Sequence, residues 1–234
     1  MKRFFALIVT LSILALGMLP AYAAGSSVAT LEQTTYVVSH SDSYRVYCFA
    51  TLQNTGAKPT SINDLLFEIR DPNGDTIEST SKYKLYPEVL EAGQTGWLVI
   101  TKDVKDIDSK AGIDSFNLTI TAKVNDDKAA HALSATAEYI AKDEDDNEDV
   151  LRAAVTNNGQ ENAFNITVAM AARDAAGKLL YITGNTAKDI GLASGCALLS
   201  RSIIKDDIMD ELKDANTPVA TVEAMAYTVE DLDD

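Results

Sequence analysis

A strand followed by a tight turn is encoded by Phe67-Glu68-Ile69-Arg70-Asp71-Pro72-Asn73-Gly74. Apolar and polar residues alternate at the start of this segment, which is typical of a strand with one buried face. Asp at the first turn position, Pro at the second and Gly at the fourth favour a type I turn. We therefore expect a β-hairpin to close at this point.

The same turn signals recur about 103 residues later in the chain. Asp71 to Gly74 recurs as Asp174 to Gly177, and other pairs share the spacing: Asn54-Thr55-Gly56 with Asn157-Asn158-Gly159, and Leu90-Glu91-Ala92-Gly93 with Leu192-Ala193-Ser194-Gly195. A period of this length is too long for one solenoid repeat. It predicts two domains of the same fold, residues 24–128 and 129–234.

Alternation along the strands indicates which residues face each core. It points Cys48, Ala50 and Leu52 inward in the first copy, and their repeat equivalents Leu151, Ala153 and Val155 inward in the second. Several short strands with turn signals in about 100 residues predict an antiparallel β-sandwich for each copy, and hence an all-β protein.

One short helix is expected within this β-structure, from about Ser202 to Ala215. Ile204, Ile208 and Leu212 follow one another at four-residue spacing, and Pro218 comes shortly after the predicted end. We interpret this apolar stripe as a face packed on the second core.

The turn and core positions resemble the bacterial immunoglobulin-like domain named for its Phe-x-Leu-Tyr-Asp motif. Asn54-x-Gly56, Phe67 to Gly74 and Leu90 to Gly93 carry the resemblance, with Ile69 and Arg70 in place of Leu and Tyr. The second copy keeps Asp174 and Gly177 of this stretch. The resemblance implies tandem immunoglobulin-like sandwiches on an exported bacterial protein, and no shared catalytic residues.

The first 23 residues have the pattern of a secretory signal peptide. A basic start at Lys2 and Arg3 precedes an apolar run from Phe4 to Leu19 and an Ala-x-Ala site that ends at Ala23. We expect cleavage near Ala23, export to the cell envelope or the extracellular space, and no transmembrane segment in the mature chain. Loss of Lys2 and Arg3 takes the net charge from −15 to −17, which argues against nucleic-acid partners.

Candidates for catalysis are few. Ser39-His40-Ser41-Asp42-Ser43 contains the residue types of a nucleophile, a base and an orienting acid, but catalytic triads converge from separate parts of a fold. His131 has no Cys or second His close in sequence with which to bind a metal. We therefore predict that the protein is not an enzyme and has no cofactor.

The acidic run from Asp143 to Asp149 suggests one exception to this expectation, a bound calcium ion. Asp143, Asp145 and Asn147 imitate the first ligands of a calcium loop. Glu148 stands where that loop needs Gly, and Ala154 where it needs a bidentate Glu. We expect a solvated, self-repelling loop, with a calcium site as the competing hypothesis.

The two cysteines are predicted to stay unpaired. Cys48 falls on an inward strand position of the first copy, and Cys196 follows a turn of the second. A disulfide would have to join the core of one sandwich to a turn of the other, which disulfide geometry seldom allows.

Aromatic residues on the opposite strand face suggest a binding surface. If Cys48 points inward, Tyr47 and Phe49 point outward beside Arg45, and Tyr and Arg are common at binding hot spots. The alternative is that the second domain, a neighbouring strand or the 81–87 loop covers them. We expect an interaction module for an envelope or extracellular protein or glycan, with a structural spacer, an exported hydrolase and a cation-binding protein as alternatives.

Overall fold

The computed structural model describes residues 27–142, 148–188 and 190–232. These residues are mostly antiparallel β-structure, and their sheets fit a β-sandwich architecture. In the described part of the chain, no helix is long and apolar enough to cross a membrane. The predicted signal peptide, residues 1–23, lies outside the described residues.

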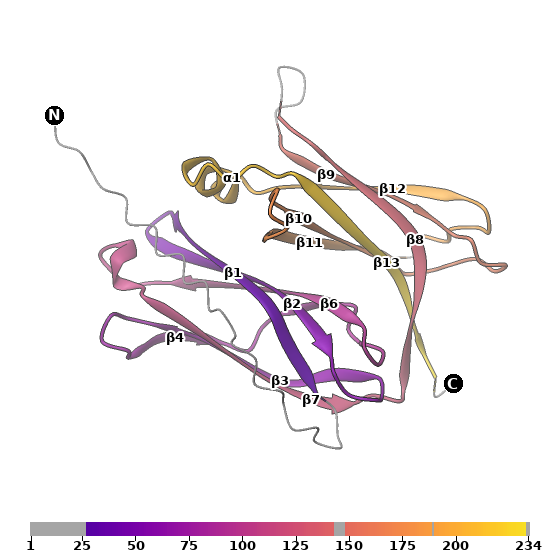
Figure 1. The fold of residues 1–234 in the computed structure, drawn as a ribbon, viewed down its shortest axis with the longest axis horizontal. Helices are drawn as coiled ribbons and strands as arrows, with labels where there is room; N and C mark the ends of the chain where they lie inside the picture. Colours follow the sequence, from indigo (N-terminus) through magenta and orange to yellow (C-terminus); the bar gives the residue numbers. More distant parts are fainter. Residues whose placement is uncertain (1–26, 143–147, 189, 233–234) are drawn as a thin grey trace.

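The strands of residues 28–124, which we call the N-terminal half, pair only with one another among the described residues (Figure 1). One sheet has the order β1-β2-β6-β5 and the other β4-β3-β7. The elements are β1 (Val28–His40), β2 (Ser43–Asn54), β3 (Thr60–Arg70), β4 (Thr76–Thr80), β5 (Lys84–Tyr86), β6 (Thr95–Val104), the 3₁₀ turn η1 (Lys110–Gly112) and β7 (Ser115–Val124).

The core of the N-terminal half follows the predicted strand faces. Cys48, Ala50 and Leu52 of β2 are fully buried, and they share one cluster with Phe67 and Ile69 of the opposite sheet. The β3–β4 hairpin closes through the predicted turn, in which the Gly74 amide donates to the Asp71 carbonyl at 3.0 Å.

Residues 128–231, the C-terminal half, form one six-stranded sheet of order β11-β10-β13-β8-β9-β12. The long strand β8 pairs with β13 through residues 128–133 and with β9 through residues 134–140, so it joins two ladders. The elements are β8 (Lys128–Ile140), β9 (Val150–Thr156), β10 (Ile166–Arg173), β11 (Leu179–Ala187), β12 (Ala197–Ile203), α1 (Asp206–Asp214) and β13 (Thr221–Asp231).

The predicted inward residues of β9, Leu151, Ala153 and Val155, all lie in the core of this half. The helix exists but is shorter than the predicted Ser202 to Ala215, because Ser202 and Ile203 still pair with β9 as part of β12. Its predicted apolar stripe, Ile204, Ile208 and Leu212, is buried in the same cluster.

Both cysteines are free thiols in the structure. Cys48 is buried in β2, and burial raises the pKa of its thiol to about 12. Cys196 is exposed beside the Gly195 turn of the other half.

Candidate functional site

The predicted binding surface lies inside the contact between the two halves. Tyr47 and Phe49 point away from their own core, as expected, but are only 2% and 1% exposed. The Phe49 ring meets Tyr181 of β11 edge to face, with 5.2 Å between ring centroids. The expectation of an exposed aromatic face is therefore corrected: the second half covers it, because burying these rings removes a large apolar area from water.

Arg45, the third predicted binding residue, is engaged by its own sheet. Its Nε donates to Asp103 Oδ1 at 2.6 Å and its terminal nitrogen to Oδ2 at 3.1 Å. This bidentate pair holds the pKa of Asp103 below its usual range. The guanidinium is therefore already neutralised by a neighbouring strand.

Polar contacts fix the relative placement of the halves around this apolar interface. The Tyr47 hydroxyl donates to Asp207 at 3.0 Å and accepts from Lys205, whose ammonium also lies 4.7 Å from the ring centroid. Further contacts join Thr34 to the Leu179 carbonyl, Arg173 to Glu32 and Lys110 to Glu211. The apolar contacts and these polar contacts together pack the two halves against each other.

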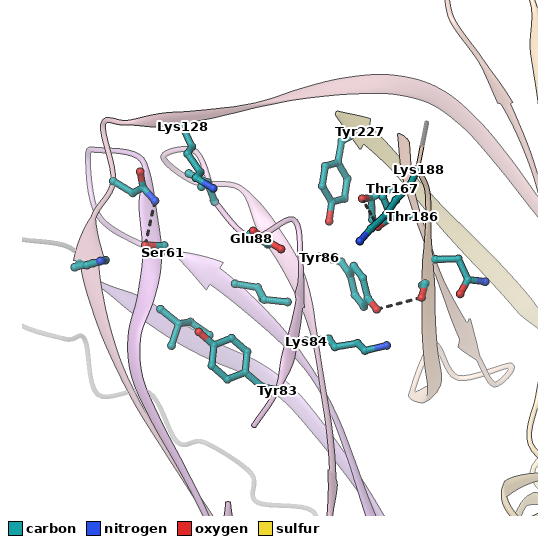
Figure 2. A pocket seen from close by; sticks show the side chains of 17 residues that line it. Ser61, Tyr83, Lys84, Tyr86, Glu88, Lys128, Thr167, Thr186, Lys188 and Tyr227 are labelled. Atoms are coloured by element: carbon teal, nitrogen blue, oxygen red, sulfur yellow. Dashed lines mark hydrogen bonds between the residues drawn. The ribbon is translucent and has the colours of Figure 1, made fainter. Parts of the chain in front are cut away.

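A cleft of about 710 Å³ opens where the two halves meet beside Tyr86 (Figure 2). The Tyr86 hydroxyl crosses the interface and donates to the Gly184 carbonyl at 3.2 Å. Both halves line the cleft, with Ser61, Ile62, Tyr83, Lys84, Leu85, Tyr86, Glu88, Val89, Lys123 and Asn125 from the first, and Lys128, Thr167, Gly184, Asn185, Thr186, Lys188 and Tyr227 from the second.

The lining of this cleft is basic although the chain as a whole is acidic. Lys84, Lys123, Lys128 and Lys188 line it, against Glu88 as the one acidic residue of the described lining. Lys128 lies 3.4 Å from Asp231, whereas the other three lysines form no ion pair with any described residue. A smaller hollow of about 300 Å³ shares Tyr83, Lys84, Tyr86 and Gly184 with the cleft and adds Lys82 and Lys205.

Hydroxyl and amide groups supply the rest of the polar lining. Asn125 donates to the Ser61 hydroxyl at 3.3 Å, and the hydroxyls of Thr167 and Thr186 lie 2.9 Å apart. Burial and the nearby Glu88 carboxylate raise the pKa of Tyr227, so its phenol stays protonated and can donate a hydrogen bond. The arrangement provides ammonium groups, donors and ring faces, which suit recognition of a polar ligand.

Two of the residues considered for catalysis, Ser43 and His131, make other side-chain contacts. The Ser43 hydroxyl donates to the His40 backbone carbonyl at 2.9 Å, and His131 pairs with Glu230 at the surface. No group of three metal-binding side chains occurs among the residues that the structure describes. The proposed calcium ligands Asp143, Asp145 and Asn147 lie outside those residues.

Sequence reasoning missed the cleft because its lysines come from separate segments. Lys82-Tyr83-Lys84 was the one local signal, and its loop was considered only as a cover for Tyr47 and Phe49. Comparison with known proteins finds no matching family model and no similar curated protein.

Proposed function

We propose that this protein is a non-catalytic, exported binding protein that holds its ligand in the cleft between the two halves. The cleft carries this proposal: its volume of about 710 Å³ lies within the roughly 300–1,000 Å³ usual for ligand sites. Because both halves contribute side chains to it, the relative placement of the halves sets its shape.

Two immunoglobulin-like sandwiches in tandem are the architecture that we propose for this binder. In each half the second strand pairs with a later strand of its own layer, β2 with β6 and β9 with β12, while β3 pairs with β7 and β10 with β13. This resembles the pairing of immunoglobulin sandwiches. The matching turns of the repeat support the same reading.

Export is proposed from residues 1–23 alone, whose basic start, apolar run and Ala-x-Ala site fit a cleaved signal. An envelope or extracellular ligand follows from that location. A structural spacer is the second candidate, and the ion pairs between the halves favour it because they stiffen the connection.

The experiment compares the mature chain with two tryptophan variants. Thr186→Trp places an indole in the cleft, whereas Thr221→Trp places one on an exposed position of β13, six residues along the strand from Tyr227 of the lining. Each protein is titrated against an envelope fraction and a panel of envelope oligosaccharides. We expect binding by the wild type and by Thr221→Trp, and its loss in Thr186→Trp.

Equal binding by the two variants would place the ligand elsewhere and refute the cleft. A wild-type chain that binds nothing in either preparation would leave the spacer as the better account.

A further inference from the structure

We propose that the cleft binds a carboxylated oligosaccharide, one whose sugar units carry uronic acid groups. This inference rests on the proposed function, since it names the class of ligand for the same cleft. The cleft is lined mainly by positive charge, whereas the whole molecule carries a negative net charge.

Positive charge gathers along the line where the halves meet. Six lysines line the cleft and the adjoining hollow, against Glu88 as the single acidic residue of the described lining. Lys128 pairs with Asp231 and Lys205 lies near Asp207, which leaves Lys82, Lys84, Lys123 and Lys188 without an ion pair to a described residue. The whole sequence has 35 acidic and 20 basic residues. A concave surface focuses the field of such a cluster, so an anion is attracted here and repelled by most of the remaining surface.

Lys84 and Lys188 are the central pair. They belong to different halves, and in the view of Figure 2 their side chains lie on either side of Tyr86. Neither forms an ion pair with a described residue. A ligand that contacts both would bridge the halves.

The cations of this cleft are separate point charges, which suit an anion whose charges are spaced along a chain. The described lining of the cleft contains lysines and no arginine. Arg presents a planar fork suited to bidentate contacts with carboxylate and phosphate alike, whereas Lys offers a compact point charge that makes single contacts. Carboxylates spaced along a chain of sugars match separate ammonium groups of this kind.

The neutral lining favours a sugar over an acidic peptide. Ser61, Thr167, Thr186, Asn125 and Asn185 offer hydroxyls and amides, which match the hydroxyl groups of a pyranose. Tyr83 lines both the cleft and the adjoining hollow and is 38% exposed, so its ring is accessible to a sugar. The Glu88 carboxylate can accept a hydrogen bond from a sugar hydroxyl.

The test is calorimetric titration of the mature chain with the trimers of galacturonate and mannuronate. The fully methyl-esterified trimers have the same skeleton without charge, and triglutamate carries similar charge without sugar rings. We expect at least one uronate trimer to bind, its ester and triglutamate to bind roughly tenfold more weakly or worse, and affinity to fall with added salt.

Two lysine pairs provide matched variants. Lys84→Gln with Lys188→Gln removes two cleft charges, and Lys105→Gln with Lys178→Gln removes two exposed charges elsewhere. The first pair should weaken uronate binding by roughly tenfold or more, because each lost charged hydrogen bond is worth about that factor. The second pair should leave it unchanged, with equal melting temperatures for both proteins.

Each contrary result separates the two proposals. If the esterified trimers bind as tightly as the uronates, the ligand need not be acidic, although it can still bind in the cleft. If triglutamate binds as tightly as the uronates, the ligand need not be a sugar. Failure of both uronates, with envelope binding still lost in Thr186→Trp, overturns this inference alone. Uronate binding that survives both Lys84→Gln with Lys188→Gln and Thr186→Trp overturns the cleft and hence both proposals.

Discussion

Asn54 and Asn157 occupy the same position in the two halves and make the same side-chain bonds. Each amide nitrogen donates to two backbone carbonyls, and each amide oxygen accepts from the Gly amide two residues on. The acceptors are the carbonyls of Lys58 and Leu90 for Asn54, and of Glu161 and Leu192 for Asn157. Both residues are buried, at 0% and 2% exposed.

This geometry explains why Asn-x-Gly recurs in the sequence. Only a side chain with two donors and an acceptor satisfies all three backbone groups at once. Asn54→Ala and Asn157→Ala should each lower the free energy of unfolding by about 2–3 kcal/mol, measured by urea denaturation. Asn73→Ala, in an exposed turn, should cost less than about 1 kcal/mol. Unequal losses at Asn54 and Asn157 would contradict the equivalence of the two turns.

Alternation along β2 predicted the residues that face the core, but not the burial of the residues on the other face. The inward positions Cys48, Ala50 and Leu52 could be predicted, because side chains of a strand alternate between faces. The burial of Tyr47 and Phe49 could not, because alternation says nothing about what covers the second face. All residues from Val46 to Leu52 are buried, so β2 is a central strand covered on both sides.

At the scale of elements, β11 is the strand that joins the halves. It lies against β1, β2 and β6 of the N-terminal half while pairing with β10 of its own. Its Gly184 permits this approach: a Cβ built there would lie 2.6 Å from the Tyr86 ring. No signal in the sequence indicated this pairing of surfaces, since a Gly in a strand has several explanations.

Gly184→Ala should therefore strain the contact between the halves and lower the free energy of unfolding by about 1–3 kcal/mol. The Tyr86→Leu variant removes the ring that the new methyl group meets. In its background Gly184→Ala should cost less, with a coupling energy above about 0.5 kcal/mol. Urea denaturation of the four proteins measures this cycle, and strictly additive losses would show that the ring and Gly184 do not interact.

The helix illustrates a boundary that depends on tertiary pairing. The apolar stripe predicted its existence and its buried face. Its start at Asp206 instead of Ser202 follows from the register of β12, in which Ile203 pairs with Val150. At the same place in the repeat, about Lys102 to Gly112, the N-terminal half has the three-residue 3₁₀ turn η1 in place of a helix.

For the whole molecule, the interface between the halves should be sensitive to alkaline pH. Burial raises the pKa of Tyr47 and of Tyr181 to about 12, whereas an unfolded phenol ionises near about 10. The folded state therefore holds these phenols neutral after the unfolded state has begun to ionise. Stability is fully present below about pH 10 and falls as pH rises toward about 12.

Urea denaturation between about pH 8 and pH 11 checks this sign, with tyrosinate absorbance followed in parallel. Tyr47→Phe lacks one of the two phenols, so its free energy of unfolding should fall less steeply with pH. A wild-type value that stays level across this range would contradict the buried, neutral state of the interface tyrosines.

The sequence predicted the net charge of the protein but not where the charges lie on the folded molecule. The sequence shows the acidity and its excess in residues 129–234, which drew attention to Asp143 to Asp149. It does not show that Lys84, Lys123, Lys128 and Lys188 line one cleft, because they come from three separate segments, near residue 84, at 123–128 and near residue 188, which the packing of the halves brings together. The candidate site therefore belongs to the whole molecule.

The most direct test of this account is amide chemical-shift mapping of the mature chain during titration with the galacturonate and mannuronate trimers. We predict that the shifts concentrate in both halves at once, around Lys84 and Tyr86 of β5 and around Gly184 to Lys188. Shifts confined to one half, or centred away from these segments, would contradict a ligand site formed between the halves.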